Sequence, residues 1–461
     1  MCSLTDPWNP SRREFVHSGL GAAAMAAGFA PSTSAASGRA HTGIRAAGSY
    51  LEVALEAARW IEASRVVTPH GVTWPADPAT PESLDTTLYQ GCPGVVLFFL
   101  DLYHATGDES FLDSACAGAD HLSAQEPVEG DAGAGLYTGL AGIAFCLEEA
   151  HRASGRAAYR TGAERCLTWL QENARPAGAG VAWNSSTDII SGSAGIGLTL
   201  LYAARAMAHD RSLELAAGAG RHLLSLGRPE AGGLKWPVSP EFPRLYPNFS
   251  HGTAGVCYFL ASLYGETGER EFRDGAVAGA RYLQAVARTD GDTLSVFHNE
   301  PDGLDLYYLS WCHGPPGTAR LFYRLAQVTG NEDWMLSVQR CARAITQSGI
   351  PEQHTPGFWN NVSKCCGNVG VGEFFLDLYR VTGESAYLDF TNRVTDDLKQ
   401  RATEDASGIR WVQAEHRTRP ELLVAQTGYM QGAAGIGSYF LRLHGQQQGQ
   451  VPAIVLPDSP F

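Results

Sequence analysis

A Gly-x-x-Gly step that runs into an apolar segment recurs seven times along this chain and limits the folds that it can adopt. The steps lie roughly fifty to sixty-five residues apart, a spacing typical of repeat architectures. They begin at Gly91, Gly139, Gly192, Gly252, Gly314, Gly367 and Gly432. Because one such repeat cannot bury its apolar face alone, neighbouring repeats have to stack against each other. The sequence therefore predicts a single array of similar units.

Two kinds of helix alternate between these steps. The segment after each step is apolar on most faces, as in "GVVLFFLDLY", whereas the following segment is amphipathic, as in "EFRDGAVAGARYLQAVA". Several units end in Thr-Gly and a polar residue, which indicates a glycine C-cap and the start of another helix. A helix that is apolar on most faces has to be buried. The pattern thus predicts an all-α fold, an α/α toroid in which seven outer helices surround seven inner ones.

This topology places all seven glycine steps at the same end of the toroid, where glycine allows backbones to approach closely. Four of the preceding loops carry a Gly-x-x-Trp pattern, at Trp74, Trp183, Trp236 and Trp411. We interpret these indoles as a cover over that end, and the alternative is direct contact with a substrate. Chemistry is expected at the end with the glycine steps.

The N-terminus resembles a twin-arginine export signal. Arg12 and Arg13 lie in "SRREF" and precede the Ala/Gly-rich run "GLGAAAMAAGFA" and a stretch of small residues. The alternative is an exposed basic terminus before a short helix, which would leave the protein in the cytoplasm. We expect residues 1–40 to be the signal and linker, residues 41–461 to be the toroid, and the protein to be periplasmic or extracellular.

Charge and hydropathy exclude two classes of partner. The formal net charge is −14, so the chain offers no basic stripe for a nucleic-acid backbone. The apolar run near the N-terminus is too short to cross a bilayer of about 30 Å, and no later segment is apolar for about 18 residues. The sequence predicts no nucleic-acid partner and no stable membrane anchor.

Three cysteines differ from the others in their surroundings. Six lie in helix-like or Gly-rich apolar segments, where a small buried thiol is expected: Cys92, Cys116, Cys146, Cys166, Cys257 and Cys341. Cys312, in "SWCHGPPGT", and Cys365 and Cys366, in "SKCCGNVGVG", occupy equivalent places in two successive repeats. Three soft ligands with an open fourth position are typical of a catalytic zinc site. The alternatives are buried structural thiols or a strained disulfide between Cys365 and Cys366.

The segments "SHG", "WCHGPPG" and "CCGNVGVG", together with the seven glycine steps, resemble the lanthionine synthetase C-like family. Its members are zinc-dependent α/α toroids, and the resemblance implies that Cys312, Cys365 and Cys366 are the zinc ligands. Known cyclases of the family add a cysteine thiol across a dehydroalanine or dehydrobutyrine. The resemblance therefore implies thioether formation in a dehydrated peptide, or addition of a small thiol, with a separate dehydratase as a possible partner.

The same resemblance suggests three catalytic residues. His251 matches the catalytic histidine of the family and Asp188 matches its acidic position, while His313 stands where many cyclases have a tyrosine. Each also has a structural interpretation, as a loop histidine, a helix N-cap or a group behind the ligands. Tyr308 stands where some cyclases have an arginine, which is a departure from the pattern of the family. The alternative function is a non-catalytic toroid that binds a peptide or thiol and holds a structural zinc.

Overall fold

The computed structural model describes residues 48–126, 133–242 and 244–461, and the predicted export signal lies outside them. Fourteen helices occur in this described part of the chain. The outer helices are α1 (Tyr50–Glu62), α3 (Glu109–Ser123), α5 (Ala157–Glu172), α7 (Asp210–Leu226), α9 (Arg270–Val286), α11 (Asp333–Thr346) and α13 (Ser385–Gln400). The inner helices are α2 (Cys92–Thr106), α4 (Leu140–Ser154), α6 (Ser193–Ala206), α8 (Thr253–Thr267), α10 (Pro315–Thr329), α12 (Asn368–Thr382) and α14 (Ala433–Gln447).

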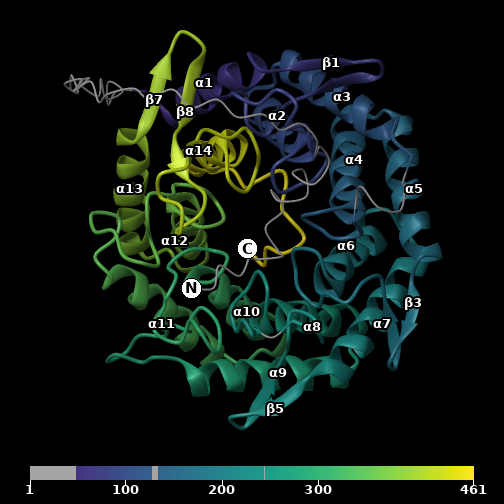
Figure 1. Cartoon of the computed structure of the whole chain (residues 1–461), viewed down its shortest axis with the longest axis vertical. Coiled ribbons are helices and arrows are strands. Elements are labelled where there is room, and N and C mark those ends of the chain that lie inside the picture. The colour runs from purple at the N-terminus through teal and green to yellow at the C-terminus, as the bar shows by residue number, and fades with distance from the viewer. Residues whose placement is uncertain (1–47, 127–132, 243) are drawn as a thin grey trace, which may run out of the picture. The chain divides into compact units, whose positions relative to one another are not determined.

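The seven inner helices form a closed ring. Each packs against the next inner helix, and α14 packs against α2 to close the ring (Figure 1). Helices α3, α5, α7, α9, α11 and α13 each cover the inner helix that precedes them, while α1 covers α14. The first and last elements of the array are therefore joined, and the predicted all-α toroid is confirmed.

The burial of the two helix types explains this arrangement. In α2 every residue from Cys92 to Leu100 is buried, which requires apolar groups all round the helix. In α9 the buried residues recur at three- and four-residue spacing, at Phe272, Gly275, Ala276, Gly279, Ala280, Tyr282 and Leu283. An apolar stripe is sufficient there because the other face meets solvent.

The Thr-Gly signals end the inner helices as predicted. Gly107 follows α2 in the left-handed conformation, with φ of 69°, and its N–H donates to the carbonyl of Tyr103 at 2.7 Å. Asp108 then accepts a hydrogen bond from the N–H of Ser110 at 2.9 Å and begins α3. Gly107 has a positive φ, and a residue with a side chain would be strained in this conformation.

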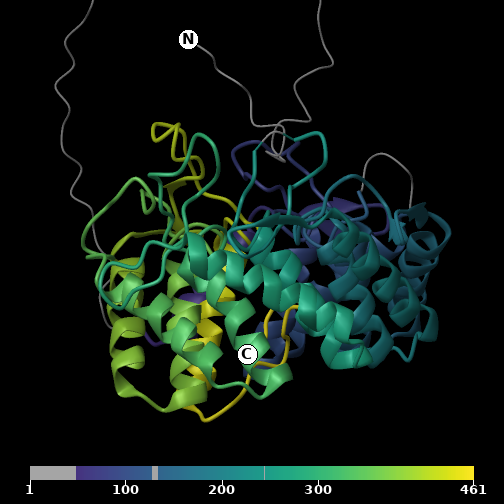
Figure 2. The ribbon, with the colours of Figure 1, turned by 90° about the horizontal axis from the view of Figure 1, so that it is seen from below.

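Short antiparallel hairpins lie in the loops that lead to several inner helices. They are β1/β2 (Val66–Thr68, Gly71–Thr73), β3/β4 (Arg175–Ala177, Gly180–Ala182), β5/β6 (Arg228–Glu230, Gly233–Lys235), β7/β8 (Ala402–Asp405, Gly408–Trp411) and β9/β10 (Gln413–Ala414, Leu423–Val424). These loops gather at one end of the helices (Figure 2).

The tryptophans of three hairpins brace the outer helices. Their indole N–H groups donate to helix carbonyls thirteen residues earlier: Trp183 to Leu170 at 2.6 Å, Trp236 to Leu223 at 2.7 Å, and Trp411 to Leu398 at 2.9 Å. Trp74 is fully buried. These contacts favour the interpretation of the indoles as a structural cover.

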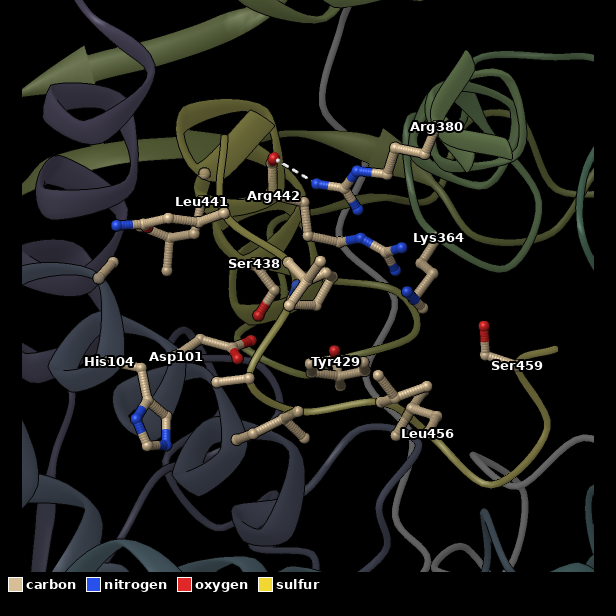
Figure 3. Close-up of a pocket in the computed structure, with 18 of the residues that line it drawn as sticks. Asp101, His104, Lys364, Arg380, Tyr429, Ser438, Leu441, Arg442, Leu456 and Ser459 are labelled. Atoms are coloured by element: carbon tan, nitrogen blue, oxygen red, sulfur yellow. Dashed lines mark hydrogen bonds between the residues drawn. The ribbon is translucent and has the colours of Figure 1, made fainter. Parts of the chain in front are cut away.

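A polar cavity lies inside the inner ring. Its empty volume is about 770 Å³, open solvent included. Asp101, Lys364, Arg380 and Arg442 line it, and residues 450–456 of the C-terminal segment form one wall (Figure 3). In the described part of the chain, no helix is long and apolar enough to span a bilayer.

Candidate metal centre

A closed ring of backbone hydrogen bonds, here called the backbone belt, joins the seven loops just before their glycine steps. It passes through the residue two positions before each first glycine, except that in the third loop Ile190 accepts one bond and Ile189, three positions before Gly192, donates the next. In each bond the backbone N–H of the first residue donates to the backbone C=O of the second. The pairs are Tyr89 and Tyr137 (3.0 Å), Tyr137 and Ile190 (3.0 Å), Ile189 and Ser250 (3.3 Å), Ser250 and Cys312 (2.9 Å), Cys312 and Cys365 (3.1 Å), Cys365 and Met430 (3.0 Å), and Met430 and Tyr89 (2.8 Å). Each loop is therefore held by both of its neighbours.

The glycine steps allow each loop to fold back onto its own helix. A Cβ atom on Gly317 would lie 1.9 Å from the carbonyl oxygen of Trp311, and one on Gly370 would lie 2.3 Å from that of Lys364. Backbone atoms cannot move aside as a flexible side chain could. The second glycine of each step is thus needed for a close approach within its own repeat.

Cys312 and Cys365 occupy neighbouring positions of the backbone belt, and Cys366 follows directly. The Sγ atom of Cys366 lies 3.4 Å from that of Cys312 and 3.5 Å from that of Cys365. All three sulfurs lie within 4.8 Å of one another. Zinc–sulfur bonds of about 2.3 Å in a tetrahedral site separate the sulfurs by about 3.8 Å. The donor set and its spacing fit a zinc ion with one position left for another ligand.

The three thiols affect each other's ionisation. Hydrogen bonds from Cys312, Cys366 and Tyr89 lower the pKa of Cys365. The pKa of Cys312 is raised, mainly by burial and next by the hydrogen bond with Cys365. The pKa of Cys366 is also raised, mainly by its hydrogen bonds with Cys312 and Cys365. Three adjacent thiolates repel one another, so full ionisation of the cluster requires a cation.

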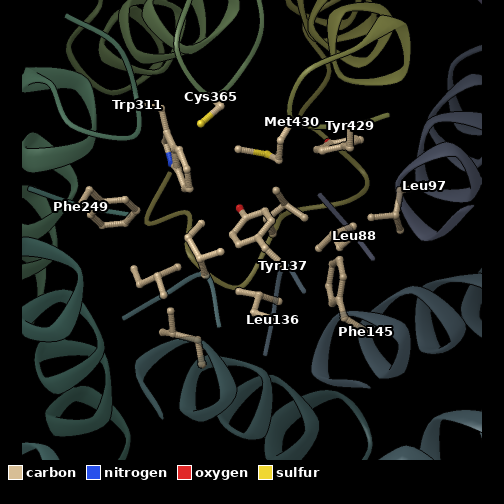
Figure 4. Packing of buried hydrophobic residues seen from close by; sticks show 14 of the residues in the cluster. Leu88, Leu97, Leu136, Tyr137, Phe145, Phe249, Trp311, Cys365, Tyr429 and Met430 are labelled. Carbon is tan, nitrogen blue, oxygen red and sulfur yellow. The ribbon is translucent and has the colours of Figure 1, made fainter. Parts of the chain in front are cut away.

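An apolar plug lies beneath the backbone belt. It consists of residues three positions before the glycine steps, among them Leu88, Leu136, Phe249, Trp311 and Tyr429, whose side chains gather around the ring axis (Figure 4). The rings of Phe249 and Trp311 pack edge to face, with centroids 5.7 Å apart. Trp311, which directly precedes Cys312, is thereby held in the packed core.

Lys364 is the exception among the plug positions. It directly precedes Cys365, is almost fully buried and pairs with the buried carboxylate of Glu373. The other six repeats have Leu, Ile, Phe, Trp or Tyr at this position. A buried ion pair therefore lies behind the repeat that supplies two of the cysteines.

The structure brings His251 and Asp188 together from two neighbouring repeats. Nδ1 of His251 lies 2.6 Å from Oδ2 of Asp188, which is fully buried. Oδ1 of Asp188 accepts hydrogen bonds from the N–H groups of Ser191 and Gly192, at 2.8 and 2.9 Å. Asp188 thus braces its own loop and also orients the imidazole of His251, whose side chain is 22% exposed.

His313 lies beside this pair but is more buried. Its ring stacks on that of His251 with a centroid distance of 5.7 Å, and its Nε2 lies 3.4 Å from Oγ of Ser250. Burial, together with His298 and His251, lowers the pKa of His313. Its side chain packs within a group of rings that also contains Tyr246.

His298 and Tyr89 belong to the site but were not predicted from the sequence. The ring of His298 lies 4.5 Å from that of His313 and 4.3 Å from that of Tyr308. His298 belongs to no glycine step, so no repeat pattern indicated it. Tyr89 occupies the first position of the backbone belt and, as stated above, hydrogen-bonds Cys365. The alignment of the seven steps could have identified Tyr89, because it stands in register with Cys312 and Cys365.

The remaining described cysteines are separate from this cluster. All six are buried and free, as predicted for small core thiols. Burial raises the pKa of Cys92 and Cys166 to about 12. No disulfide occurs among the nine cysteines that the structure describes, which excludes the Cys365–Cys366 disulfide from this state of the molecule.

Comparison with known proteins identifies a family over most of the chain. The family model described as lanthionine synthetase C-like protein matches residues 82–456. Glutathione S-transferase LANCL1 of Danio rerio is 22% identical over 143 residues, which cover 31% of this chain and 33% of that protein. The chain thus matches about a third of the length of this curated relative.

Solved structures show the same fold. Nisin cyclase superposes with a TM-score of 0.56 and 17% identity, over 78% of this chain and 89% of that one. The Lin0763 protein from Listeria innocua superposes with a TM-score of 0.51 and 13% identity, over 88% and 99% of the two chains. At these identities the likeness concerns the fold alone.

Proposed function

Because the chain belongs to the lanthionine synthetase C-like protein family, we propose that it is a zinc-dependent enzyme that adds a thiol to a dehydroamino acid. The product would be a thioether, formed within a peptide or with a small thiol. One observation carries this proposal: three cysteine sulfurs lie within 4.8 Å of one another, and the loop of Cys312 is bonded directly to the loop of His251, whose imidazole pairs with Asp188. A metal ligand set and a proton carrier are thus held by one backbone belt.

Cys312, Cys365 and Cys366 would hold the zinc ion. When bound, zinc would supply a Lewis-acidic centre that keeps a substrate thiol ionised near neutral pH. The chain holds the backbones of Cys312 and Cys365 through hydrogen bonds on both sides. Cys366 is held through its backbone N–H, which donates to Oγ of Ser363 at 3.2 Å.

His251 would carry the proton. Asp188 accepts the hydrogen of Nδ1, which leaves Nε2 of the imidazole to accept the thiol proton and later donate it. The S–H bond breaks and the sulfur forms a bond to the β-carbon, the π bond between the two carbons is lost so that a single bond remains, and the proton ends on the α-carbon. Atoms and electrons balance without an oxidant. His251 suits this role better than His313 because its side chain is more exposed.

Metal analysis tests the ligand set. Purified protein should contain one zinc ion per chain, and Cys365→Ala and Cys366→Ala should lose it. Cys341→Ala is the matched control, since Cys341 is a buried thiol in the outer helix α11 and should not affect zinc content. Zinc well below one equivalent in the wild type, or unchanged zinc in both ligand variants, would overturn the site.

Activity is tested with a peptide that carries a dehydroalanine and a cysteine. We expect the free thiol to disappear without a change in mass, faster with the wild-type protein than without protein. The variant His251→Ala should lose this increase in rate. If the wild type binds zinc but the reaction proceeds at its uncatalysed rate, the protein is a binding toroid with a structural zinc. The dehydrated residue would come from a separate dehydratase-type reaction.

We also propose that the chain is exported by a twin-arginine route. The observation that supports it is the pair Arg12 and Arg13 before an Ala/Gly-rich run. Replacement of both arginines by lysine should retain the protein inside the cell, which fractionation and immunoblotting would measure. Unchanged export of the double variant would contradict this proposal.

A further inference from the structure

The C-terminal segment lies inside the inner ring and contacts one face of α10, the helix that begins three residues after Cys312 (Figures 1 and 2). Its contacts recur at helical spacing on this face. They are Arg320 Nη1 with Asp458 Oδ2 (3.2 Å), the stacked rings of Tyr323 and Phe461 (4.4 Å between centroids) and Gln327 Nε2 with the carbonyl of Pro460 (3.1 Å). The end of the chain is therefore seated by specific contacts.

Asp458 is the most buried of these residues. Its side chain is fully inaccessible, and its two carboxylate oxygens have different partners. Oδ1 accepts a hydrogen bond from the hydroxyl of Tyr137 at 3.1 Å, and Oδ2 pairs with Arg320, whose guanidinium also donates to the backbone carbonyl of Asp458 at 3.0 Å. A buried charge of this kind requires all of its partners.

Both partners of Asp458 pack against residues next to the metal centre. The ring of Tyr137 meets that of Trp311 edge to face at 5.5 Å, and Trp311 directly precedes Cys312. The guanidinium of Arg320 lies 5.6 Å from the ring centroid of Phe249, which stands two residues before His251. Tyr137 is itself a member of the backbone belt, as shown above. Asp458 is thereby linked to the loop of Cys312 and to the loop of His251.

We propose that Asp458 is a positioning residue of the metal centre. It holds Tyr137 and Arg320 in place through hydrogen bonds and charge, and these pack against Trp311 and Phe249, which set the backbones of Cys312 and His251. This proposal concerns the same centre as the proposed function and therefore rests on it. Groups behind metal ligands affect metal affinity by about 10- to 100-fold when they are removed.

The variant Asp458→Asn tests this role with little change of shape. Asparagine can still accept a hydrogen bond from Tyr137, but it no longer neutralises Arg320. The matched control is Glu148→Gln, because Glu148 is also fully buried and pairs with an arginine, Arg160, at 2.6 Å in the helix pair α4 and α5. Tyr137→Phe removes only the hydroxyl contact with Asp458. It tests the same role if Asp458→Asn does not fold.

Two measurements distinguish positioning from stability. Competition with a chromophoric chelator should show zinc affinity about tenfold lower in Asp458→Asn. The visible absorption bands of the cobalt-substituted protein should shift, since they report the geometry of the ligands. Tyr137→Phe should change the zinc affinity and the cobalt absorption bands in the same direction as Asp458→Asn, but by less. Glu148→Gln should lower the midpoint of thermal unfolding and leave the zinc affinity and the cobalt absorption bands unchanged.

A third measurement does not depend on metal. In the zinc-free protein, hydrogen exchange at the amides of Ser250 and Cys312 should be faster in Asp458→Asn than in the wild type, and unchanged in Glu148→Gln. Unchanged exchange, affinity and cobalt spectrum in Asp458→Asn and Tyr137→Phe would overturn the inference. Equal changes in Glu148→Gln would also overturn it. A wild type without zinc contradicts the proposed function, and the exchange experiment still decides the role of Asp458.

Discussion

Nδ1 of His251 lies 2.6 Å from Oδ2 of Asp188, although the two residues are 63 positions apart in the sequence and belong to different repeats. The contact depends on the bond from Ile189 N–H to the carbonyl of Ser250, because this bond joins their loops. The candidate proton carrier and the candidate ligand Cys312 are in turn joined through Ser250. The proposed chemistry is therefore distributed over several repeats.

Loss of the histidine should affect turnover without affecting metal. His251→Ala should lower turnover by about 100- to 10,000-fold, the range expected when a general acid or base is removed. Asp188→Asn should also lower it, because an amide does not favour the same tautomer of His251. Steady-state kinetics with the dehydroalanine peptide measure both, and zinc content should remain at one equivalent.

The control for this prediction is His151→Ala, a change at the C-terminal end of α4. It should leave turnover near the wild-type value. Loss of zinc in His251→Ala would contradict the assignment, since it would mean that His251 is needed to hold the metal rather than to move a proton.

Removal of zinc should leave the fold intact. The backbone belt holds Cys312 and Cys365 without metal, and most stability comes from helix packing. Zinc at about 100 times its Kd should add about 2.7 kcal/mol to the free energy of unfolding. Chelation should therefore lower the midpoint of thermal unfolding while the far-UV circular dichroism at 25 °C stays helical.

The variant Cys365→Ala provides the comparison for chelation. Its unfolding midpoint should not respond to the chelator, because it has lost a ligand. Collapse of the circular dichroism signal on chelation of the wild type would show that metal holds the fold, as in zinc fingers.

The second glycine of the fifth step should tolerate no side chain. Gly317→Ala would place a Cβ 1.9 Å from the carbonyl oxygen of Trp311, so α10 or its loop has to move. We expect a loss of about 1–3 kcal/mol in the free energy of unfolding and weaker zinc binding, since Trp311 adjoins Cys312. Urea unfolding and zinc competition measure the two effects.

Gly445→Ala is the matched control. Gly445 lies inside α14, and the nearest atom to an added Cβ is 3.8 Å away. Alanine should raise the free energy of unfolding by about 0.5–1 kcal/mol because it favours the helix. Equal destabilisation by both changes would contradict the steric explanation.

Stability should fall as pH rises from about 4 to about 7 because of Asp101. Burial raises the pKa of this carboxyl to about 7, despite the lowering effects of Ser438, Arg442 and Lys364. Between the unfolded pKa near 4 and the folded value, the folded state binds more protons, so deprotonation costs stability. The contribution is present at pH 4 and is lost as pH approaches and passes 7.

Asp101→Asn removes this titration. At pH 8 its free energy of unfolding should exceed that of the wild type by about 1–3 kcal/mol. This is less than the full shift would give at about 1.4 kcal/mol per pKa unit, because Asp101 lines the cavity, where solvent screens its charge. Urea unfolding at pH 5 and pH 8 would measure the difference. If the gap between variant and wild type is the same at both pH values, Asp101 is not the responsible group.

The repeat pattern was enough to predict the toroid. The seven glycine steps locate the starts of the inner helices, and the apolar or amphipathic character of each following segment assigns it to a ring. These features are local, since a helix that is apolar on most faces has to be buried wherever it lies. The equivalent positions of Cys312 and Cys365 in successive repeats also followed from the sequence, because adjacent repeats have to place equivalent residues side by side.

Only the tertiary structure placed His298 beside His313 and Asp458 against Tyr137 and Arg320. Neither residue belongs to a glycine step, so no repeat pattern relates its position to that of the cysteines. The contact of Tyr89 with Cys365 depends on closure of the ring, which brings the first repeat next to the seventh and so within reach of Cys365 in the sixth. The sequence by itself determined the repeats and the positions of the three candidate ligands. The residues around the ligands were decided by ring closure and packing, which join parts of the chain that no local pattern connects.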